Sequence, residues 1–330
     1  MKLSFLAAGG YQGAAGGGAW PVPPQNCDPE VAARSLGMSL ELARRADELG
    51  FDWVSVSEHH YAPLMLTPNP LVWAGALTQV VKHAKIALLG PVLTINNPVR
   101  VAEETAMLDV LSGGRVVALF LRGVPYEWKV YSSEPADTKG ATQDGIDLIL
   151  KAWTEPEPFA WQTAHHHFDV VSVWPRPLQR PHPPVYGSGN SEDSVLFAAQ
   201  RRLGLAISFA PPEQVAKHVA LYRAEAEKAG WSPGPDQVLY RAVAQIAASD
   251  AEADAHAAHA GHGRFVPYFN GGPNRVLGQI EALHAAGVGV VDMAFGPMGH
   301  ERSLAALEML SRDVLPAMRS AAYAPPRGQA

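Results

Sequence analysis

The sequence predicts an α/β fold, a (β/α)8 TIM barrel with insertions at the C-terminal face of its strands. Two observations lead to this expectation. Short apolar segments alternate with longer segments of helical periodicity, and eight such pairs follow one another along the 330 residues. A doubly wound open sheet also alternates strands with helices and stays open as the alternative. We expect a single domain over residues 1–330, because α/β barrels use this length as one domain with insertions.

Eight apolar segments are the expected strands, and the third is nearly continuous in apolar residues, as strands buried on both faces are. They are Lys2–Ala7, Phe51–Ser57, Ile86–Leu93, Arg115–Arg122, Pro184–Ser188, Leu205–Phe209, Val238–Ala248 and Val288–Phe295. The expected helices are Asp28–Gly50, Leu71–Lys82, Pro98–Leu111, Gly140–Trp153, Ser191–Arg202, Pro212–Ala229, Pro273–Ala286 and Arg302–Arg319. The first helix shows the boundary signals well, since Asp28 can cap it, Pro29 suits its first turn and Gly50 follows its last periodic residue.

Four connections are longer than the links usual between such elements: residues 9–27, 123–139, 156–183 and 251–272. The first is rich in Gly and Pro, and the second carries Tyr126, Trp128 and Tyr131. Long connections at a barrel mouth are usually lids or walls of a substrate pocket, which is the role we expect here. Solvated decoration without a function is the alternative.

Composition excludes several classes of protein. The chain is 47% hydrophobic and 18% charged, with a net charge of −6 and pI near 6.1, so nucleic acid is not an expected partner. The single Cys27 excludes an intrachain disulfide framework and a zinc site of several cysteines. No run of about 18 apolar residues is present, so no membrane association is expected. A soluble cytoplasmic protein is the default expectation.

Polar side chains follow four of the expected strands, and the carboxyl ends of barrel strands are where active sites form. Glu58, His59 and His60 end the second strand, and a glutamate beside an imidazole can support proton transfer near neutral pH. Thr94 and Asn96 end the third strand. Arg122 and Gly123 end the fourth, combining a fixed cation with a residue that lets the backbone approach a ligand.

The fifth strand runs into a glycine-rich turn, GSGNS, which opens a helix. Free backbone N–H groups at such a helix start, with the hydroxyls of Ser191 and Ser194, favour a phosphate. A plain turn with an N-cap serine explains the same letters, and Arg122 alone could be an ion-pair residue in the core. The four strand ends together describe a pocket with an anion clamp, an acid/base group and aromatic lids.

A metal-dependent hydrolase is one alternative, because His59, His60 and the run His165–His167 invite it. Adjacent histidines on a strand point to opposite faces, so they do not easily bind one ion. No H-E-x-x-H or comparable spacing is present, and we expect no metal.

At these residues the chain resembles the bacterial luciferase-like (LLM) family of flavin-dependent monooxygenases, whose fold is a (β/α)8 barrel. The segments that carry the resemblance are ELGFDWVSVSEHHY, NNPVRVAEETAMLDVLSGGRV, LRG, WPRPLQRPHPPVYGSGNSEDS and GVGVVDMAFG. The LDVLSGGR block and the EHH strand end are fairly specific together. The resemblance therefore covers most of the chain and implies an enzyme.

The resemblance also implies roles for particular residues. The flavin phosphate would be held by Arg122, Gly189, Asn190, Ser191 and Ser194, and the flavin would be lined by Thr94 and Asn96. Ala74, in the segment Trp73–Gly75, would lie near a backbone bend that supports the flavin ring. His59 would be the acid/base group, with Glu58 beside it in the site. Leu121 stands where bacterial luciferase has a reactive cysteine, so no thiol role is implied. Leu121, Tyr126 and Trp128 are the expected pocket residues.

The implied chemistry uses reduced FMN (FMNH2) from a separate flavin reductase, O2 and a C4a-(hydro)peroxyflavin to oxygenate a small organic substrate. Use of the deazaflavin F420 for hydride transfer is an alternative, because related barrels bind it in a similar place. A flavin-binding protein without turnover is another. Barrels of this family often dimerise, so a homodimer stays open. Light emission is not implied.

Overall fold

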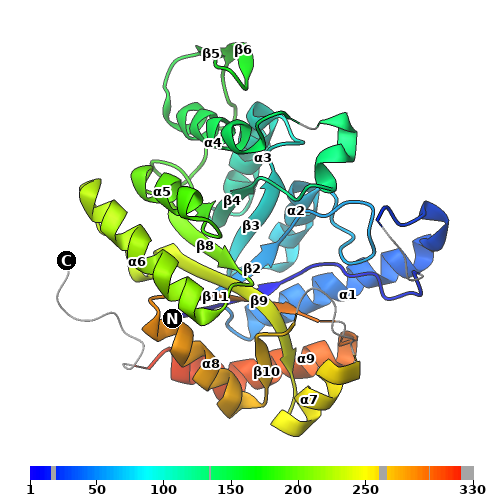
Figure 1. Ribbon diagram of the computed structural model, residues 1–330. Coiled ribbons are helices and arrows are strands. Elements are labelled where there is room, and N and C mark those ends of the chain that lie inside the picture. Colours follow the sequence, from blue (N-terminus) through cyan, green and yellow to red (C-terminus); the bar gives the residue numbers. More distant parts are fainter. Residues whose placement is uncertain (16–19, 134, 260–265, 297, 321–330) are drawn as a thin grey trace. The chain divides into compact units, whose positions relative to one another are not determined.

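The computed structural model describes residues 1–15, 20–133, 135–259, 266–296 and 298–320. Its main sheet has the strand order β10-β9-β11-β1-β2-β3-β4-β7-β8, and a further pairing of β8 with β9 closes it (Figure 1). Eight parallel strands thus form a closed barrel with helices around it, because the short β10 only extends the sheet beside β9. The predicted (β/α)8 barrel is confirmed, and the open sheet is excluded by the closing pair.

Each expected strand and each expected helix but the last is present, with ends shifted by a few residues. The barrel strands are β1 (Lys2–Leu6), β2 (Trp53–Val56), β3 (Lys85–Val92), β4 (Val116–Leu121), β7 (Val185–Ser188), β8 (Gly204–Ser208), β9 (Val238–Ile246) and β11 (Val290–Phe295). The helices after them are α1 (Pro29–Glu48), α2 (Pro70–Val80), α3 (Pro98–Leu111), α4 (Thr138–Thr154), α5 (Glu192–Gln200), α6 (Pro212–Lys228), α8 (Pro273–Ala285) and α9 (His300–Met309).

Local sequence signals set many of these boundaries. The carboxylate of Asp28 accepts the backbone N–H of Glu30 at 2.8 Å, as expected of the residue that caps α1. Asn97 caps α3 in the same way, accepting the N–H groups of Val99 and Arg100. The predicted stop after α3 is also present, since Gly113 has a φ of +70°, which a side chain would strain.

The last helix departs from the single helix expected over Arg302–Arg319. It runs as α9, a π-helical turn (Leu310–Val314) and α10 (Leu315–Met318). Pro316 lies at the start of α10, where it has no N–H to donate and its ring would clash with a carbonyl of the preceding turn. The wider turn before the proline accommodates this clash. Among the described helices, none is both long and apolar enough to cross a membrane.

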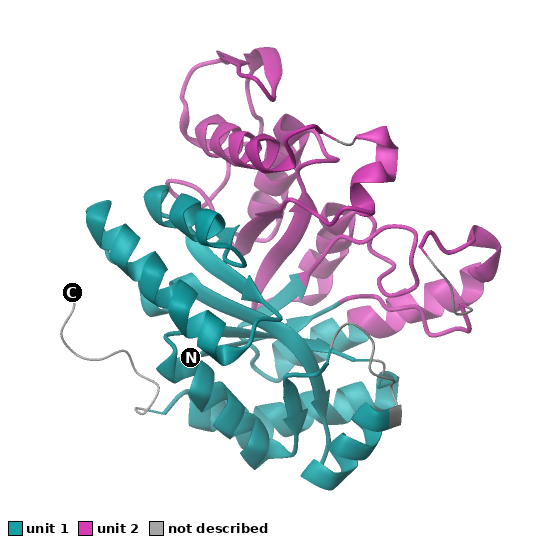
Figure 2. Ribbon diagram, in the orientation of Figure 1, with its two compact units in different colours: residues 1–7, 41–55, 186–330 teal, residues 8–40, 56–185 magenta. Residues whose placement is uncertain are grey.

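The chain divides into two compact units (Figure 2). Unit 1 comprises residues 1–7, 41–55 and 186–330, and unit 2 comprises residues 8–40 and 56–185. In unit 1 the strand β11 lies between β1 and β9 in parallel register, with Asp292 opposite Ser4 and Arg241. Unit 2 contains β3 and β4, which pair in parallel, and the helices α2 to α4. The single domain over residues 1–330 stays a prediction.

Three of the long connections follow the carboxyl ends of strands, as expected for residues 9–27, 123–139 and 251–272. In unit 2 the first two touch, because the ring centroids of Trp20 and Tyr126 lie 5.1 Å apart. In unit 1 the third contains α7 (Asp250–His259) and β10 (Phe269–Gly271), which pairs with the end of β9. Residues 16–19, 134 and 260–265 of these connections lie outside the described residues.

Residues 156–183 differ from the expected pocket wall. They join α4 to β7 and form the hairpin β5 (Phe159–Gln162) and β6 (His167–Val171), drawn in green beyond α4 in Figure 1. The side-chain amide of Gln179 donates to the carbonyl of Val116, so the base lies at the amino end of β4. Only the tip of the β5–β6 hairpin reaches the start of α4, where a ring nitrogen of His166 donates a hydrogen bond to the carbonyl of Ala141. A connection from a helix to the next strand has both ends at the amino ends of the strands, which explains the difference.

Candidate active site

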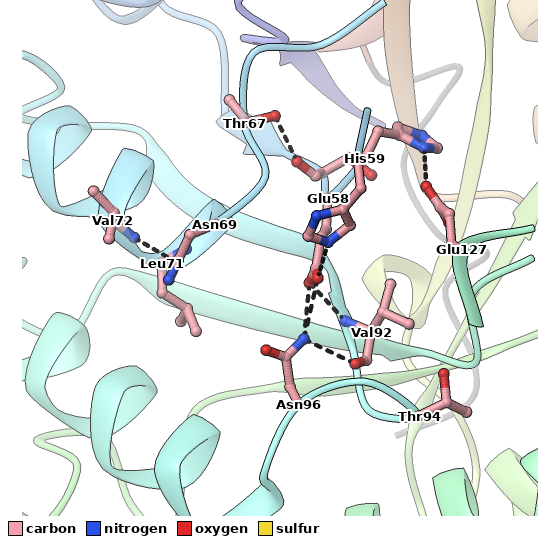
Figure 3. A network of polar contacts seen from close by, with 12 residues as sticks. Glu58, His59, Thr67, Asn69, Leu71, Val72, Val92, Thr94, Asn96 and Glu127 are labelled. Atoms are coloured by element: carbon pink, nitrogen blue, oxygen red, sulfur yellow. Dashed lines mark hydrogen bonds and ion pairs between the residues drawn. The ribbon is translucent and has the colours of Figure 1, made fainter. Parts of the chain in front are cut away.

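Glu58 lies at the carboxyl end of β2 beside an irregularity of β3. The pairing of β3 with β4 shifts between Leu89 and Val92, and Gly90 there has a φ of +148°. The Glu58 carboxylate accepts the backbone N–H of Val92 at 2.9 Å (Figure 3). A bulge frees backbone groups from the ladder, and here the buried carboxylate satisfies one of them.

The same carboxylate has two further partners. Asn96 donates from its side-chain amide to both oxygens of Glu58, at 3.1 and 3.3 Å, and to the carbonyl of Val92 at 2.9 Å. The Nε2 atom of His60 lies 2.8 Å from Glu58 Oε1, and both side chains are 2% exposed. Glu58 therefore joins β2, the bulge and His60, and it does not contact His59 by hydrogen bond.

His59 instead pairs with a glutamate that sequence reasoning did not select. Its Nδ1 atom lies 2.7 Å from Oε1 of Glu127, in the connection after β4 (Figure 3). The Glu127 side chain is 2% exposed, whereas that of His59 is 27% exposed. Within the described part of the chain, His59 Nε2 has no hydrogen-bond partner. The Nδ1 atom of His59 is therefore bound to a buried carboxylate, whereas its Nε2 atom is available for proton exchange.

Arg122 ends β4 with its side chain exposed. Its guanidinium lies 5.8 Å from the centroid of the Trp128 ring, and its carbonyl accepts hydrogen bonds from Trp128 Nε1 and Thr94 Oγ1. No carboxylate of the described residues forms an ion pair with it, so the ion-pair alternative fails there. The next residue, Gly123, has a φ of +73°, and a Cβ there would lie 2.7 Å from Val92. The backbone thus requires glycine at this position.

The predicted pocket residues lie in unit 2 near these groups. Trp20 donates from its indole to the carbonyl of His60 at 2.8 Å, and its ring contacts those of Tyr61 and Tyr126. Leu121 packs with Trp20 on a small cluster of buried apolar residues, Val92, Ile95 and Val130. The pocket role of Leu121, Tyr126 and Trp128 stays a prediction.

The GSGNS turn belongs to unit 1, where three contacts hold it. Ser191 caps α5, its hydroxyl accepting the N–H of Ser194 and lying 2.8 Å from the Ser194 hydroxyl. Asn190 accepts the N–H of Ser208 at 2.9 Å. The buried His218 donates from Nδ1 to the carbonyl of Gly189 at 2.6 Å. The N-cap interpretation of this turn is confirmed, while phosphate binding stays a prediction.

Two features of the turn bear on an anion there. A Cβ on Gly189 would lie 2.8 Å from the side chains of Leu205 and Ile207, so only glycine allows this backbone path. Glu192 stands in the first turn of α5, and its hydrogen bond to the Lys217 ammonium holds the pKa of that carboxyl below its usual value. Lys217 thus offsets the negative charge of Glu192, while Asp193 is a second acidic residue in the same turn. Arg122 and Ser191 belong to different units, so their joint action as a clamp stays a prediction.

Ala74, Thr94 and Asn96 are the residues expected to line the flavin. Ala74 is fully buried inside α2, and a backbone irregularity with a positive φ lies in β3 at Gly90. A continuous hydrogen-bonded helix leaves no backbone group there for a ligand. Thr94 donates to the carbonyl of Arg122 and Asn96 to Glu58, so both side chains link strand ends. Their contact with a flavin, like that of Ala74, stays a prediction.

The described residues contain no group of three or more His, Cys, Asp or Glu placed to hold a metal ion. His59 and His60 turn to different glutamates. In the run of three histidines, His166 bonds the backbone of α4, and His165 lies 3.7 Å from Asp137.

A second polar group that sequence reasoning missed lies in unit 1. Asp292 on β11 accepts from Ser4 at 2.5 Å, from Ser55 at 2.7 Å and from Arg241 Nε at 2.5 Å. Asp292 is fully buried, and Arg241 is 8% exposed. The available signal for Asp292 and Arg241 was a single charged residue inside an apolar strand. For Glu127 it was a carboxylate between the aromatic residues Tyr126 and Trp128 in the connection after β4.

Comparison with known proteins assigns the chain. The model of a family described as luciferase-like monooxygenase matches residues 17–305. The chain belongs to this family. The predicted resemblance to this family is confirmed.

Two curated relatives of this family illustrate the similarity. The alkanal monooxygenase alpha chain of Photorhabdus laumondii is 30% identical over 188 residues, which is 57% of this chain and 51% of the relative. The oxygenase component of a flavin-dependent trigonelline monooxygenase from Acinetobacter baylyi is 27% identical over 252 residues, 73% of this chain and 67% of the relative. The matched part of the chain thus spans about half the length of relatives such as the alkanal monooxygenase.

Three solved structures share the fold. Monooxygenase RslO1 from Streptomyces bottropensis has a TM-score of 0.81 at 23% identity, over 96% of this chain and 99% of that one. The oxygenating constituent of 3,6-diketocamphane monooxygenase from Pseudomonas putida, in complex with FMN, has a TM-score of 0.73 at 20% identity, over 86% of this chain and 94% of that one. An F420-dependent secondary alcohol dehydrogenase has a TM-score of 0.76 at 16% identity, over 97% of this chain and 99% of that one. At these identities the similarity establishes the fold alone.

Proposed function

We propose that this chain is the oxygenase of a two-component flavin system: it takes reduced FMN from a separate reductase and uses O2 to oxygenate a small organic substrate. The observation that carries the proposal is the His59–Glu127 pair at the end of β2, in a chain of the luciferase-like monooxygenase family. The relative from Acinetobacter is named as flavin-dependent and as an oxygenase component, which supports both the flavin and the reductase.

The donors present suit an FMN phosphate. Arg122 carries a guanidinium that no described carboxylate neutralises, and Ser191 and Ser194 offer hydroxyls at the start of α5. Gly189 beside them is buried, and its N–H already donates to the carbonyl of Ala206 at 2.7 Å. A phosphate dianion binds such combinations of cation, hydroxyl and helix N-terminus. These residues would hold the phosphate, while the ends of β3, with Thr94 and Asn96, would face the flavin ring. When bound, reduced FMN supplies the two electrons that activate O2.

His59 would move the proton. Its Nδ1 is bound to Glu127, so Nε2 is the atom that would exchange a proton with the substrate. The apolar cluster around Leu121 and the rings of Trp20 and Tyr126 would exclude water from the reacting groups. General acid/base help of this kind contributes roughly 10²–10⁴ in rate.

Hydride transfer with F420 is the second candidate, because an F420-dependent dehydrogenase shares the fold with a TM-score as high as that of the FMN-bound neighbour. Relatives of higher sequence identity carry flavin-dependent and alkanal monooxygenase names, which favours FMN. The homodimer and the cytoplasmic location stay predictions.

The test is oxygenation with labelled O2. Purified chain, FMN, NADH and a free flavin reductase are incubated under ¹⁸O2 with decanal, cyclohexanone or trigonelline as probes, and products are analysed by mass spectrometry. We expect one ¹⁸O atom in a product of at least one probe. Two results together would favour hydride transfer instead: no ¹⁸O label in the product of any probe, and an anaerobic titration in which the chain binds F420 tightly but does not bind FMN.

A further inference from the structure

We infer that Glu127 is the positioning residue of His59: it keeps the imidazole proton on Nδ1 and so leaves Nε2 as the proton-transferring atom. The role of Glu127 in catalysis rests on the proposed function. The tautomer of His59, however, can be measured without any substrate or cofactor.

The geometry defines which nitrogen is which. Glu127 Oε1 lies 2.7 Å from His59 Nδ1, a short distance for a hydrogen bond between a nitrogen and an oxygen. An ionised carboxylate only accepts, so the nitrogen that faces it must carry the hydrogen. The lone pair of the neutral ring is then on Nε2. A carboxylate that orients a histidine in this way sets its tautomer in hydrolytic triads and metal sites alike.

No other described carboxylate competes for His59. Glu58 is adjacent in sequence, but His60, Asn96 and the backbone of Val92 occupy its two oxygens. Arg122 lies on the same connection as Glu127, where its guanidinium faces the ring of Trp128. The charged groups of the described residues around this site are therefore Glu127, the Glu58–His60 pair and Arg122.

The connection after β4 is held in the conformation that delivers Glu127. Val130 is fully buried in the apolar cluster, and Ser133 donates from its hydroxyl to the carbonyl of Thr94 at 2.8 Å. Between them Tyr131 and Ser132 have φ values of +59° and +54°. Residues other than glycine adopt such values at a cost, and they persist only where the surroundings fix them. Tertiary contacts, and not local preference, thus bring this carboxylate to His59.

A purely structural role does not account for Glu127. A buried carboxylate that only anchored a loop would be expected to accept several donors, as Glu58 does. Among the described residues, His59 is the only side chain that bonds the Glu127 carboxylate. The second nitrogen of that same His59 is the one left accessible.

The test combines the tautomer with the rate. The ¹⁵N chemical shifts of the His59 ring, assigned with the His59→Gln variant, are recorded at pH 8 for the unmodified chain, Glu127→Ala and Glu127→Gln. Glu104→Gln, which removes a half-buried carboxylate paired with the exposed Arg100, is the matched control. We expect Nδ1–H in the unmodified chain and in Glu104→Gln. Glu127→Ala should shift to Nε2–H, whereas Glu127→Gln should keep Nδ1–H because its amide oxygen still accepts.

With the probe that takes up ¹⁸O, turnover of Glu127→Ala should fall by roughly 10²–10⁴ at unchanged FMN affinity, and Glu127→Gln should recover part of it. An unchanged tautomer in folded Glu127→Ala would overturn the positioning role. A switched tautomer with full turnover would overturn its importance for catalysis. Absence of labelled product with the unmodified chain would refute the proposed oxygenation and leave the tautomer result to stand by itself.

Discussion

The adjacent residues His59 and His60 form two glutamate–histidine pairs that differ in one respect. His60 and Glu58 are each 2% exposed, and Glu58 is further bonded by Asn96 and the β3 bulge. His59 is 27% exposed and bonds only Glu127, which is itself buried. A pair closed on all sides cannot exchange protons with a ligand, whereas a pair with one free nitrogen can. The same two residue types thus stabilise the fold in one case and are available for chemistry in the other.

The largest expected effect is the difference in oxygenation rate between the His59→Ala and His60→Ala variants. His59→Ala should lower the oxygenation rate by roughly 10²–10⁴, because the proton-transferring group is lost, with little change in FMN affinity. His60→Ala should instead destabilise the chain by leaving the Glu58 charge buried without its partner. Turnover with the labelled probe and urea unfolding measure the two effects. Equal effects of both substitutions on turnover, in folded protein, would remove the distinction.

Glu58→Ala tests the closed pair from the other side. The substitution leaves the N–H of Val92, the amide of Asn96 and the ring of His60 without their acceptor. A buried polar group left without its hydrogen-bond partner costs about 1–3 kcal/mol in unfolding free energy. Glu104→Gln, which breaks only the pair with the exposed Arg100, should cost under about 1 kcal/mol. A similar small cost for both, measured by urea unfolding, would contradict the structural role of Glu58.

Arg122→Ala tests the exposed cation near the open pair. Loss of a charge-assisted contact to phosphate should weaken FMN binding by about 10–100-fold. Riboflavin lacks the phosphate, so its affinity should change little. Fluorescence titration of both flavins against the variant and the unmodified chain measures the ratio. Equal weakening of FMN and riboflavin would refute the phosphate contact.

The effect of burial by itself can be measured at Tyr222, on α6 in unit 1. Burial raises the pKa of its phenol, and the hydroxyl donates to the carbonyl of Leu203 at 2.6 Å. A raised pKa stabilises the fold below the unfolded value near 10, and this stability is lost as the pH rises further. The loss is at most about 1.4 kcal/mol per pH unit.

Tyr222→Phe removes both the hydrogen bond and this alkaline loss. At pH 8 the variant should be about 1 kcal/mol less stable in urea unfolding. Above pH 10 the difference should shrink and then reverse. Tyr240→Phe should behave in the same way, since burial also raises the pKa of Tyr240 and its hydroxyl donates to Ala210. A constant difference between pH 8 and 11 would show that Tyr222 is not shielded as described.

Much of the fold was predictable because its signals are local. Strand runs such as Ile86–Leu93 are apolar throughout, and caps such as Asn97 and stops such as Gly113 mark helix ends. The π-helical turn before Pro316 was missed, because a proline in a periodic segment shows that the helix must adapt but not how. The base of residues 156–183 lies at the amino ends of the strands and not at the barrel mouth, because these residues connect a helix to the next strand.

The candidate site was predictable only in part. Strand ends correctly indicated Glu58, His59, Thr94, Asn96 and Arg122 as neighbours in unit 2, because the carboxyl ends of neighbouring parallel strands share one edge. Which polar groups bond each other was not predictable. Glu58 was assigned to His59 by adjacency, although successive residues on an extended backbone point in opposite directions. The buried Arg241–Asp292 pair was missed for a similar reason, since its members lie 51 residues apart.

The sequence by itself determined the barrel and the family, because periodicity, caps and the EHH and LDVLSGGR segments are readable residue by residue. Only the tertiary structure decided which histidine is open to chemistry. The carboxylate that binds His59 comes from 68 residues further along the chain, on a connection held by Val130 and strained at Tyr131. Such a contact depends on where packing places a loop, and no local preference of the residues encodes it.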